Sequence, residues 1–202
     1  METLTPKKQR KNKKIRFVRS IINEIEEINP TIPDDIKLEA EKESLKHVYS
    51  KSVRKKKKIN NIAECVFKAY ENLGNPKDPV MIAKLLNVNK NEITKTINSS
   101  SDNYIIFHFP HEYIKDYLMI LCPDNDIDDL LKNITELAFQ VYELKNDILD
   151  KKPQDVAVAL ILFYMQKFGF VIENKEGFYS DISKSSATIN KLIKTISSAV
   201  NS

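Results

Sequence analysis

The residues of this chain best suited to chemistry lie near its C-terminus, where small hydroxyl and amide side chains alternate with lysines. They are Lys184, Ser185, Ser186, Thr188, Asn190, Lys191 and Lys194. Hydroxyl groups and free backbone amides at a helix start bind phosphate, and lysines add positive charge. Thr188 or Asn190 could reach the edge of a base. The pattern favours contact with a nucleic acid, although the same serines would equally cap a helix that binds nothing.

Basic residues also gather in two runs of the first half of the chain. One run includes Lys7 to Lys14, and the other includes Arg54, Lys55, Lys56, Lys57 and Lys58; Lys90 and Lys95 follow later. Clustered like charges repel one another, and they become favourable when they replace the counterions around a nucleic acid. A pair of solvated segments is the alternative interpretation. We include Arg54 to Lys58, Lys90 and Lys95 among the candidate nucleic-acid-binding residues.

Sequence support for catalysis or metal binding is weak. His108 and His111 lie three positions apart, and Asp124, Asp126 and Asp128 alternate like the start of a calcium loop, but the glycine and final glutamate of such a loop are absent. Cys65 and Cys122 have no Cys-x-x-Cys spacing, so we expect reduced thiols and neither a disulfide nor a zinc site. We therefore expect no enzyme, no metal and no cofactor.

Composition predicts an all-α protein. The chain has 202 residues, of which 42% are hydrophobic and 30% charged, and only three are glycine. Sheets joined by tight turns usually need more glycine than this. The longest apolar run, from Val156 to Met165, is about half of what a bilayer crossing requires. We expect an intracellular protein without a membrane-spanning segment.

Hydrophobic spacing predicts helices that recur in the same order about 95 residues apart. In the first half they cover approximately residues 15–28, 33–48, 59–73, 79–86 and 90–98, and the basic run at 51–58 reads as a linker before the third. In the second half they cover approximately 113–121, 127–144, 153–163, 175–182 and 186–200. The segment Val156 to Phe163 is apolar on almost every side, which predicts the buried central helix of its lobe.

These segments predict a two-lobed organisation. A basic N-terminal tail at 1–14 precedes a first repeat at 15–98, a linker at 99–110 and a second repeat at 111–202. The polar residues 99–103 are typical of a domain boundary. The apolar run 104–109 either packs the lobes together or docks a partner, and packing is the favoured interpretation.

Two lobes of five helices, each with a buried third helix, a short fourth and an exposed fifth, resemble the tandem cyclin folds of the transcription initiation factor IIB family. The resemblance rests on residues 153–160 of the third helix in the second lobe, and on residues 89–95 and 185–191 at the two fifth helices. It implies two tandem five-helix cyclin-like domains. The implied partners are double-stranded promoter DNA, the TATA-binding protein and RNA polymerase, in the nucleus or in a viral factory or virion.

Departures from the family pattern are also visible. No cysteine precedes Cys65, so the N-terminal zinc ribbon of the family cannot be built before it, which puts polymerase contact in doubt. Asn190 stands where the family has an arginine that reads a promoter element; since asparagine reads adenine and arginine reads guanine, altered specificity follows. Two other hypotheses remain open: a cyclin-like regulator that docks a kinase or another protein without DNA, and a scaffold subunit of a virion or complex.

Overall fold

The protein is all-α. The computed structural model describes residues 21–46, 55–99, 108–123 and 126–201, and within these ranges it contains helices and no strand. The predicted fold class is confirmed at this level. In the same ranges, no helix combines the length and apolar character that a membrane crossing needs. The chain divides into two compact units, unit 1 at Met1–Ile105 and unit 2 at Ile106–Ser202, and the division lies within the stretch expected to be a linker.

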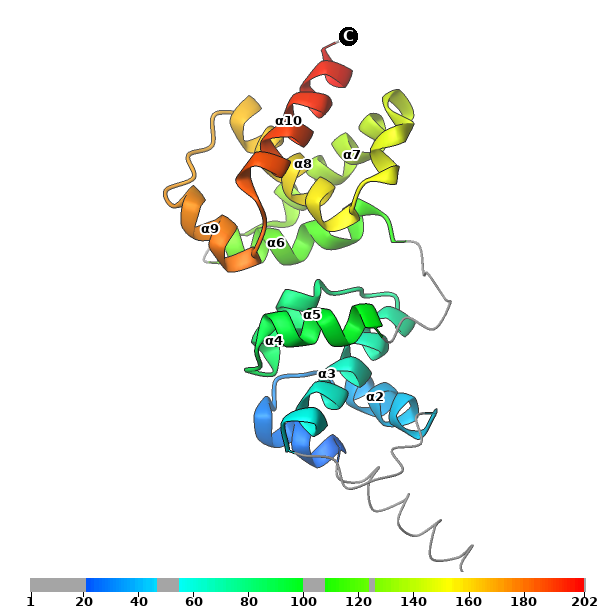
Figure 1. Cartoon of the computed structure of the whole chain (residues 1–202). Helices are drawn as coiled ribbons and strands as arrows, with labels where there is room; N and C mark the ends of the chain where they lie inside the picture. The colour runs from blue at the N-terminus through cyan, green and yellow to red at the C-terminus, as the bar shows by residue number, and fades with distance from the viewer. Residues whose placement is uncertain (1–20, 47–54, 100–107, 124–125, 202) are drawn as a thin grey trace, which may run out of the picture. The chain divides into compact units, whose positions relative to one another are not determined.

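Unit 1 is built around one long helix. Its elements are a helical segment at 21–28, α2 (Asp34–Lys46), α3 (Lys55–Asn72), α4 (Pro79–Leu85) and α5 (Lys90–Ser99) (Figure 1). Helix α3 packs against α2, α4 and α5, and Ile62, Val66 and Tyr70 are buried in the core. Asp78 caps α4, because its Oδ1 accepts a hydrogen bond of 2.8 Å from the amide of Val80. The short fourth helix and the fifth helix of the first lobe are confirmed.

Two predictions about unit 1 were wrong. The spacing of Ile36, Ala40, Leu45 and Val48 predicts one apolar side for the helix at 33–48. Ile36 and Ala40 are buried on α2, but Leu45 is exposed, and Glu43 and Ser44 take the buried positions of that turn. Glu43 is paired with Lys46 and accepts a hydrogen bond from Asn72, so the buried charge is compensated. The basic run also forms no linker up to residue 58, because Lys55 to Lys58 make the first turn of α3. Val48 and Arg54 lie outside the described residues.

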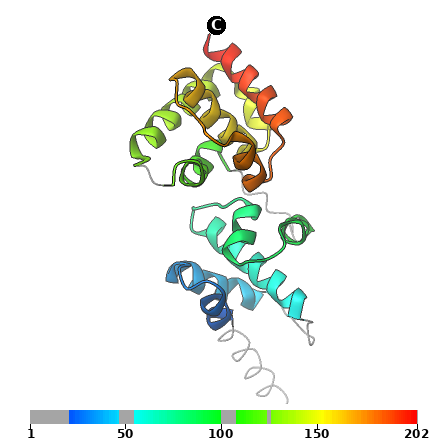
Figure 2. The same cartoon turned by 90° about the vertical axis from the view of Figure 1, so that its left-hand side faces the viewer.

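Unit 2 repeats this plan around α8 (Pro153–Lys167). The other elements are the 3-10 turn η1 (Pro110–Tyr113), α6 (Ile114–Leu121), α7 (Asp128–Leu144), the 3-10 turn η2 (Asn146–Asp150), α9 (Lys175–Ile182) and α10 (Ser186–Val200). Every residue from Val156 to Phe163 is buried, because α6, α7, α10 and η1 all pack against α8 (Figure 2). The predicted central helix is confirmed. The sequence analysis did not predict η2.

The turns of the two units match one another. Gly74 and Gly169 have φ of 70° and 73° just after α3 and α8, and Asn87 and Ser183 have φ of 50° and 54° just after α4 and α9. Each forms a helix-ending motif in which the following amide donates back to the helix, at 3.0 Å for Asn75, 2.9 Å for Phe170, 2.9 Å for Val88 and 3.1 Å for Lys184. Each pair is separated by about 95 positions, which is the spacing at which the helix pattern recurs in the sequence.

Candidate nucleic-acid interface

Helix α10 presents a polar face that contains four of the candidate residues. Ile189, Leu192 and Ile196 are buried against the rest of unit 2. Thr188, Asn190, Lys191 and Lys194 are exposed, and α10 carries no acidic residue. Among the described side chains, none forms an ion pair with Lys191 or Lys194. Two lysines, an amide and a hydroxyl are therefore available to solvent on one helix.

The Ser185 side chain does not cap the start of α10. Ser185 occupies the capping position in an extended conformation, and its side chain makes no capping hydrogen bond. In unit 1 the equivalent position is Asn89, whose Oδ1 accepts hydrogen bonds from the amides of Asn91 at 3.0 Å and Glu92 at 3.4 Å. A capping hydrogen bond therefore does not explain why a serine occupies position 185. The amides that begin α10 face no side-chain acceptor from Ser185, whereas those that begin α5 do.

Lys184 plays a different part from the other candidates. Its Nζ lies 3.2 Å from Oδ1 of Asp155, and the two side chains are only 14% and 18% exposed. Asp155 stands in the first turn of α8, where a carboxylate is favourable at the positive end of the helix dipole. The ion pair thus fixes the turn that precedes α10 to the central helix. The structure places Lys184 as a positioning residue, apart from the exposed lysines of α10.

The two pairs of fourth and fifth helices pack differently. In unit 1, α4 packs against α5, while in unit 2, α9 packs against α6. Residue Val88, which corresponds to Lys184, packs partly buried against the core of unit 1. Lys90 and Lys95 are exposed on α5 beside Glu92, so the charge of α5 is mixed where that of α10 is purely basic. Unit 1 has the more compact helix pair, and unit 2 has the more basic fifth helix.

The basic run of unit 1 sits where lysine is least favourable in a helix. Lys55 to Lys58 form the first turn of α3, which contains no acidic residue. The positive end of a helix dipole disfavours cations, by about 0.3–1 kcal/mol for each exposed charge. Lys58 is paired with Glu24. The side chains of Lys55, Lys56 and Lys57 lie outside the described part of the structure. An anion bound at this turn would remove the unfavourable interaction.

The histidines of unit 2 belong to an aromatic cluster. His111 lies 4.9 Å from the ring of Phe139 and 5.6 Å from that of Phe109, and burial lowers its pKa. His108 contacts Glu112, with 2.9 Å between Nδ1 and Oε2. The structure groups no three metal-ligating side chains within its described ranges. These contacts show that both histidine side chains pack within unit 2.

Sequence reasoning missed two residues that shape this site. Asp155 lies in the range 153–160 that carries the resemblance, but nothing in the spacing of the sequence links it to Lys184. Asn89 begins the range 89–95; an asparagine just before a helix is a recognisable capping signal, so its role could have been found. Cys65 is buried and Cys122 half-buried, and the two form no disulfide with each other.

Comparisons with family models and curated proteins do not assign this chain to a family. No protein-family model matches the sequence, and no curated protein matches it.

Proposed function

We propose that the protein binds double-stranded DNA through α10, as a tandem cyclin-fold protein of the factor IIB type. The observation that carries the proposal is the combination on α10 of a start without a side-chain cap and an exposed face with Lys191, Lys194, Asn190 and Thr188. A helix placed in a major groove reads bases with the residues near its N-terminus and holds phosphates with the lysines beside them. In this proposal Thr188 or Asn190 reaches a base, and Lys191 and Lys194 face phosphates.

The first turn of α3 supports the proposal from unit 1. Its four lysines lack acidic neighbours within that turn, an arrangement that costs helix stability and that phosphate would relieve. Since local rules are broken most often at functional sites, Lys55 to Lys58 form a second contact in this proposal. By the resemblance described above, the TATA-binding protein is the proposed partner on the DNA.

The test is a mobility shift on a TATA-containing duplex with and without TATA-binding protein. The double variant Lys191→Ala with Lys194→Ala is compared with the matched double variant Lys115→Ala with Lys132→Ala, which removes the same charge from exposed positions of α6 and α7. We expect the complex to be lost in the α10 variant and kept in the matched variant. Equal binding by both variants would contradict the proposed interface, and no binding by the wild-type chain would contradict DNA binding.

A cyclin-like protein-binding regulator is the second candidate function. The observation that favours it is a set of exposed leucines in unit 1, Leu38 and Leu45 on α2 and Leu73 after α3. Exposed large apolar side chains are typical of a protein interface when they are grouped. Loss of partner capture with Leu38→Ser and Leu45→Ser, together with unchanged behaviour of the α10 variant, would favour this candidate.

A further inference from the structure

Unit 2 contains a cavity at the C-terminal end of α8, at the opposite end of that helix from the Lys184 to Asp155 ion pair. Its volume is about 530 Å³, and it lies between α7, the end of α6 and the loop after α8. Asp155 and Tyr164 are separated by nine positions on α8, or about 13 Å along the helix. The cavity is therefore a separate surface from the proposed DNA interface.

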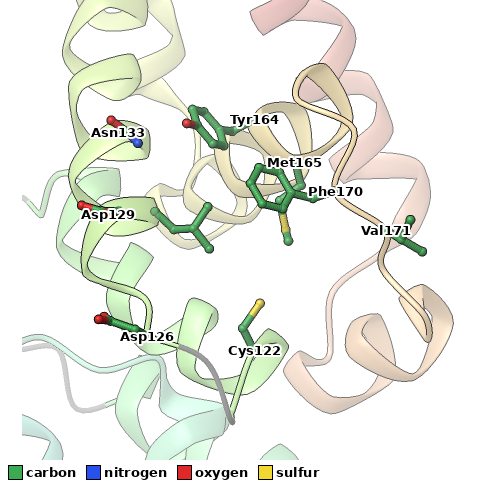
Figure 3. A pocket seen from close by; sticks show the side chains of 9 residues that line it. Cys122, Asp126, Asp129, Asn133, Tyr164, Met165, Phe170 and Val171 are labelled. Carbon is green, nitrogen blue, oxygen red and sulfur yellow. The ribbon is translucent and has the colours of Figure 1, made fainter.

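The centre of the cavity is apolar. Met165 and Phe170 line its middle and the Cys122 thiol points toward them, while Val171 lies farther out on the loop after α8 (Figure 3). Phe170 is 45% exposed and Val171 85% exposed, although both are large apolar side chains. Phe168 also stays exposed, with its ring 4.5 Å from that of Tyr164. Water contact with this much apolar surface is unfavourable unless a partner covers it.

The helix-ending motif does not itself require these aromatic residues. In unit 2, Gly169 adopts φ of 73° and the Phe170 amide donates to the Met165 carbonyl at 2.9 Å. Unit 1 forms the same motif with Gly74, and there Asn75 occupies the position of Phe170. A polar residue therefore serves in the same motif, and the Phe170 ring makes an additional contact in unit 2, where it stacks on the ring of Tyr164 with centroids 6.4 Å apart. This contact leaves Phe170 45% exposed.

Acidic residues border the cavity on α7. Asp126 and Asp129 line it, and in Figure 3 their carboxylates turn outward from the apolar centre. Asp128 stands between them, and Lys132 is the nearby cation on α7. Asp128 and Asp129 in the first turn of α7 also interact favourably with the positive end of the helix dipole, so they stabilise α7 whether or not a partner binds. Beside an open apolar cavity, they also provide charge that a basic partner complements.

We propose that this cavity is a docking site for a short segment of a protein partner, in which a large apolar side chain stands next to lysine or arginine. The apolar side chain covers Met165 and Phe170, and the basic residue pairs with Asp129 or Asp126 at the border. Phe170 and Val171 are 45% and 85% exposed, so this side of the cavity is open to solvent, which favours a segment of a protein over a small molecule that needs an enclosed pocket. The proposal does not depend on DNA binding.

The test begins with selection of random twelve-residue peptides displayed on phage against the full-length chain. A selected peptide is then labelled with fluorescein, and its binding is measured by anisotropy. Phe170→Asn installs the residue that unit 1 uses in the same motif, so the helix-ending hydrogen bond is expected to form in the variant, and circular dichroism checks that the variant is folded. Phe139→Asn is the matched control, since Phe139 is an exposed phenylalanine of α7 that does not line the cavity.

We expect selected peptides to pair a large apolar residue with Lys or Arg. We expect Phe170→Asn to weaken their binding about tenfold or more, as the loss of a central apolar contact does. Asp129→Asn should weaken binding severalfold, and Glu136→Gln, at another exposed carboxylate of α7, should leave it unchanged.

Three results would overturn the proposal. One is the absence of enriched peptides, and another is binding that Phe170→Asn leaves unchanged. The third is enrichment of peptides without basic residues, which would contradict the class of partner. Sedimentation of the wild-type chain across a concentration series identifies self-association, and a dimer that Phe170→Asn dissociates would assign the cavity to a second copy instead.

Discussion

The ion pair between Lys184 and Asp155 makes a prediction that separates structural from DNA-binding lysines. Substitution of Lys184 by methionine keeps most of the hydrocarbon stem and removes the charge, which leaves the Asp155 carboxylate, 18% exposed, without its lysine partner. Fully exposed ion pairs contribute about 0.2–1 kcal/mol, and breaking a fully buried pair costs about 3–5 kcal/mol. At 14% and 18% exposure this pair lies between those limits, so we expect a loss of about 1–2 kcal/mol.

The assay is thermal and urea unfolding of four chains: the wild type, Lys184→Met, Asp155→Asn and the double variant. For a unit of roughly 100 residues, each kcal/mol lowers the Tm by roughly 4–8 °C. We expect the double variant to be less destabilised than the sum of the single variants, with a coupling of about 1 kcal/mol. Lys191→Ala is the matched control and should change stability by less than about 0.5 kcal/mol. A coupling within about 0.3 kcal/mol of zero would refute the reasoning.

Three further predictions follow from caps, turns and titration. Asn89→Ala removes the cap of α5 and should lower the free energy of unfolding in urea by about 1 kcal/mol. Ser185→Ala removes no capping hydrogen bond and should lower it by less. Equal losses would contradict the difference between the two helix starts. Gly169→Ala should cost about 1 kcal/mol by calorimetry, because its φ is positive and no atom lies within 4 Å of the added carbon; an unchanged Tm would argue against that conformation. Burial lowers the pKa of His111, so as the pH falls the histidine is protonated in the unfolded chain before it is protonated in the folded chain. The free energy of unfolding should therefore fall as the pH drops below about 6.5. His111→Gln should flatten this pH dependence of stability, and an unchanged pH dependence would exclude His111 as its source.

Helix positions could be predicted from the sequence where apolar spacing and stop signals agree. Helix α4 begins at Pro79 and α8 at Pro153, and Gly74 and Gly169 end the third helix of each unit. In these places the local preferences of proline and glycine agree with the tertiary packing, so the boundaries are correct to within a few residues.

Packing details could not be predicted where long-range contacts override local pattern. Leu45 was expected in the core because it continues the apolar stripe of α2, but Glu43 is buried there instead, paired with Lys46 and bonded to Asn72. Charge composition alone favours an unstructured basic linker at 51–58, whereas the packing of α3 extends the helix back to Lys55. Local pattern does not reveal the hydrogen bond from Asn72 to Glu43 or the ion pair between Lys58 and Glu24, because each joins residues about 30 positions apart.

In the candidate site, too, local features could be predicted from the sequence and long-range contacts could not. The sequence correctly marks the start of α10 and its exposed polar residues, since these depend on local helix geometry. It does not reveal that Lys184 is held by Asp155, because that contact joins residues 29 positions apart on two elements. The cavity at Phe170 was missed for the same reason, since its lining comes from three separated segments.

The salt dependence of DNA affinity tests the central claim most directly. Each lysine that neutralises a phosphate contributes about 0.9 to the slope of log affinity against log salt. Removal of Lys191 and Lys194 should therefore reduce the slope by about 1.8, which corresponds to roughly tenfold less sensitivity between 50 and 200 mM salt. Anisotropy of a labelled duplex measures this slope for the wild type, the α10 double variant and the Lys115 and Lys132 double variant. A reduced slope confined to the α10 variant is the predicted result, and equal slopes for all three chains would contradict the claim that α10 holds the DNA.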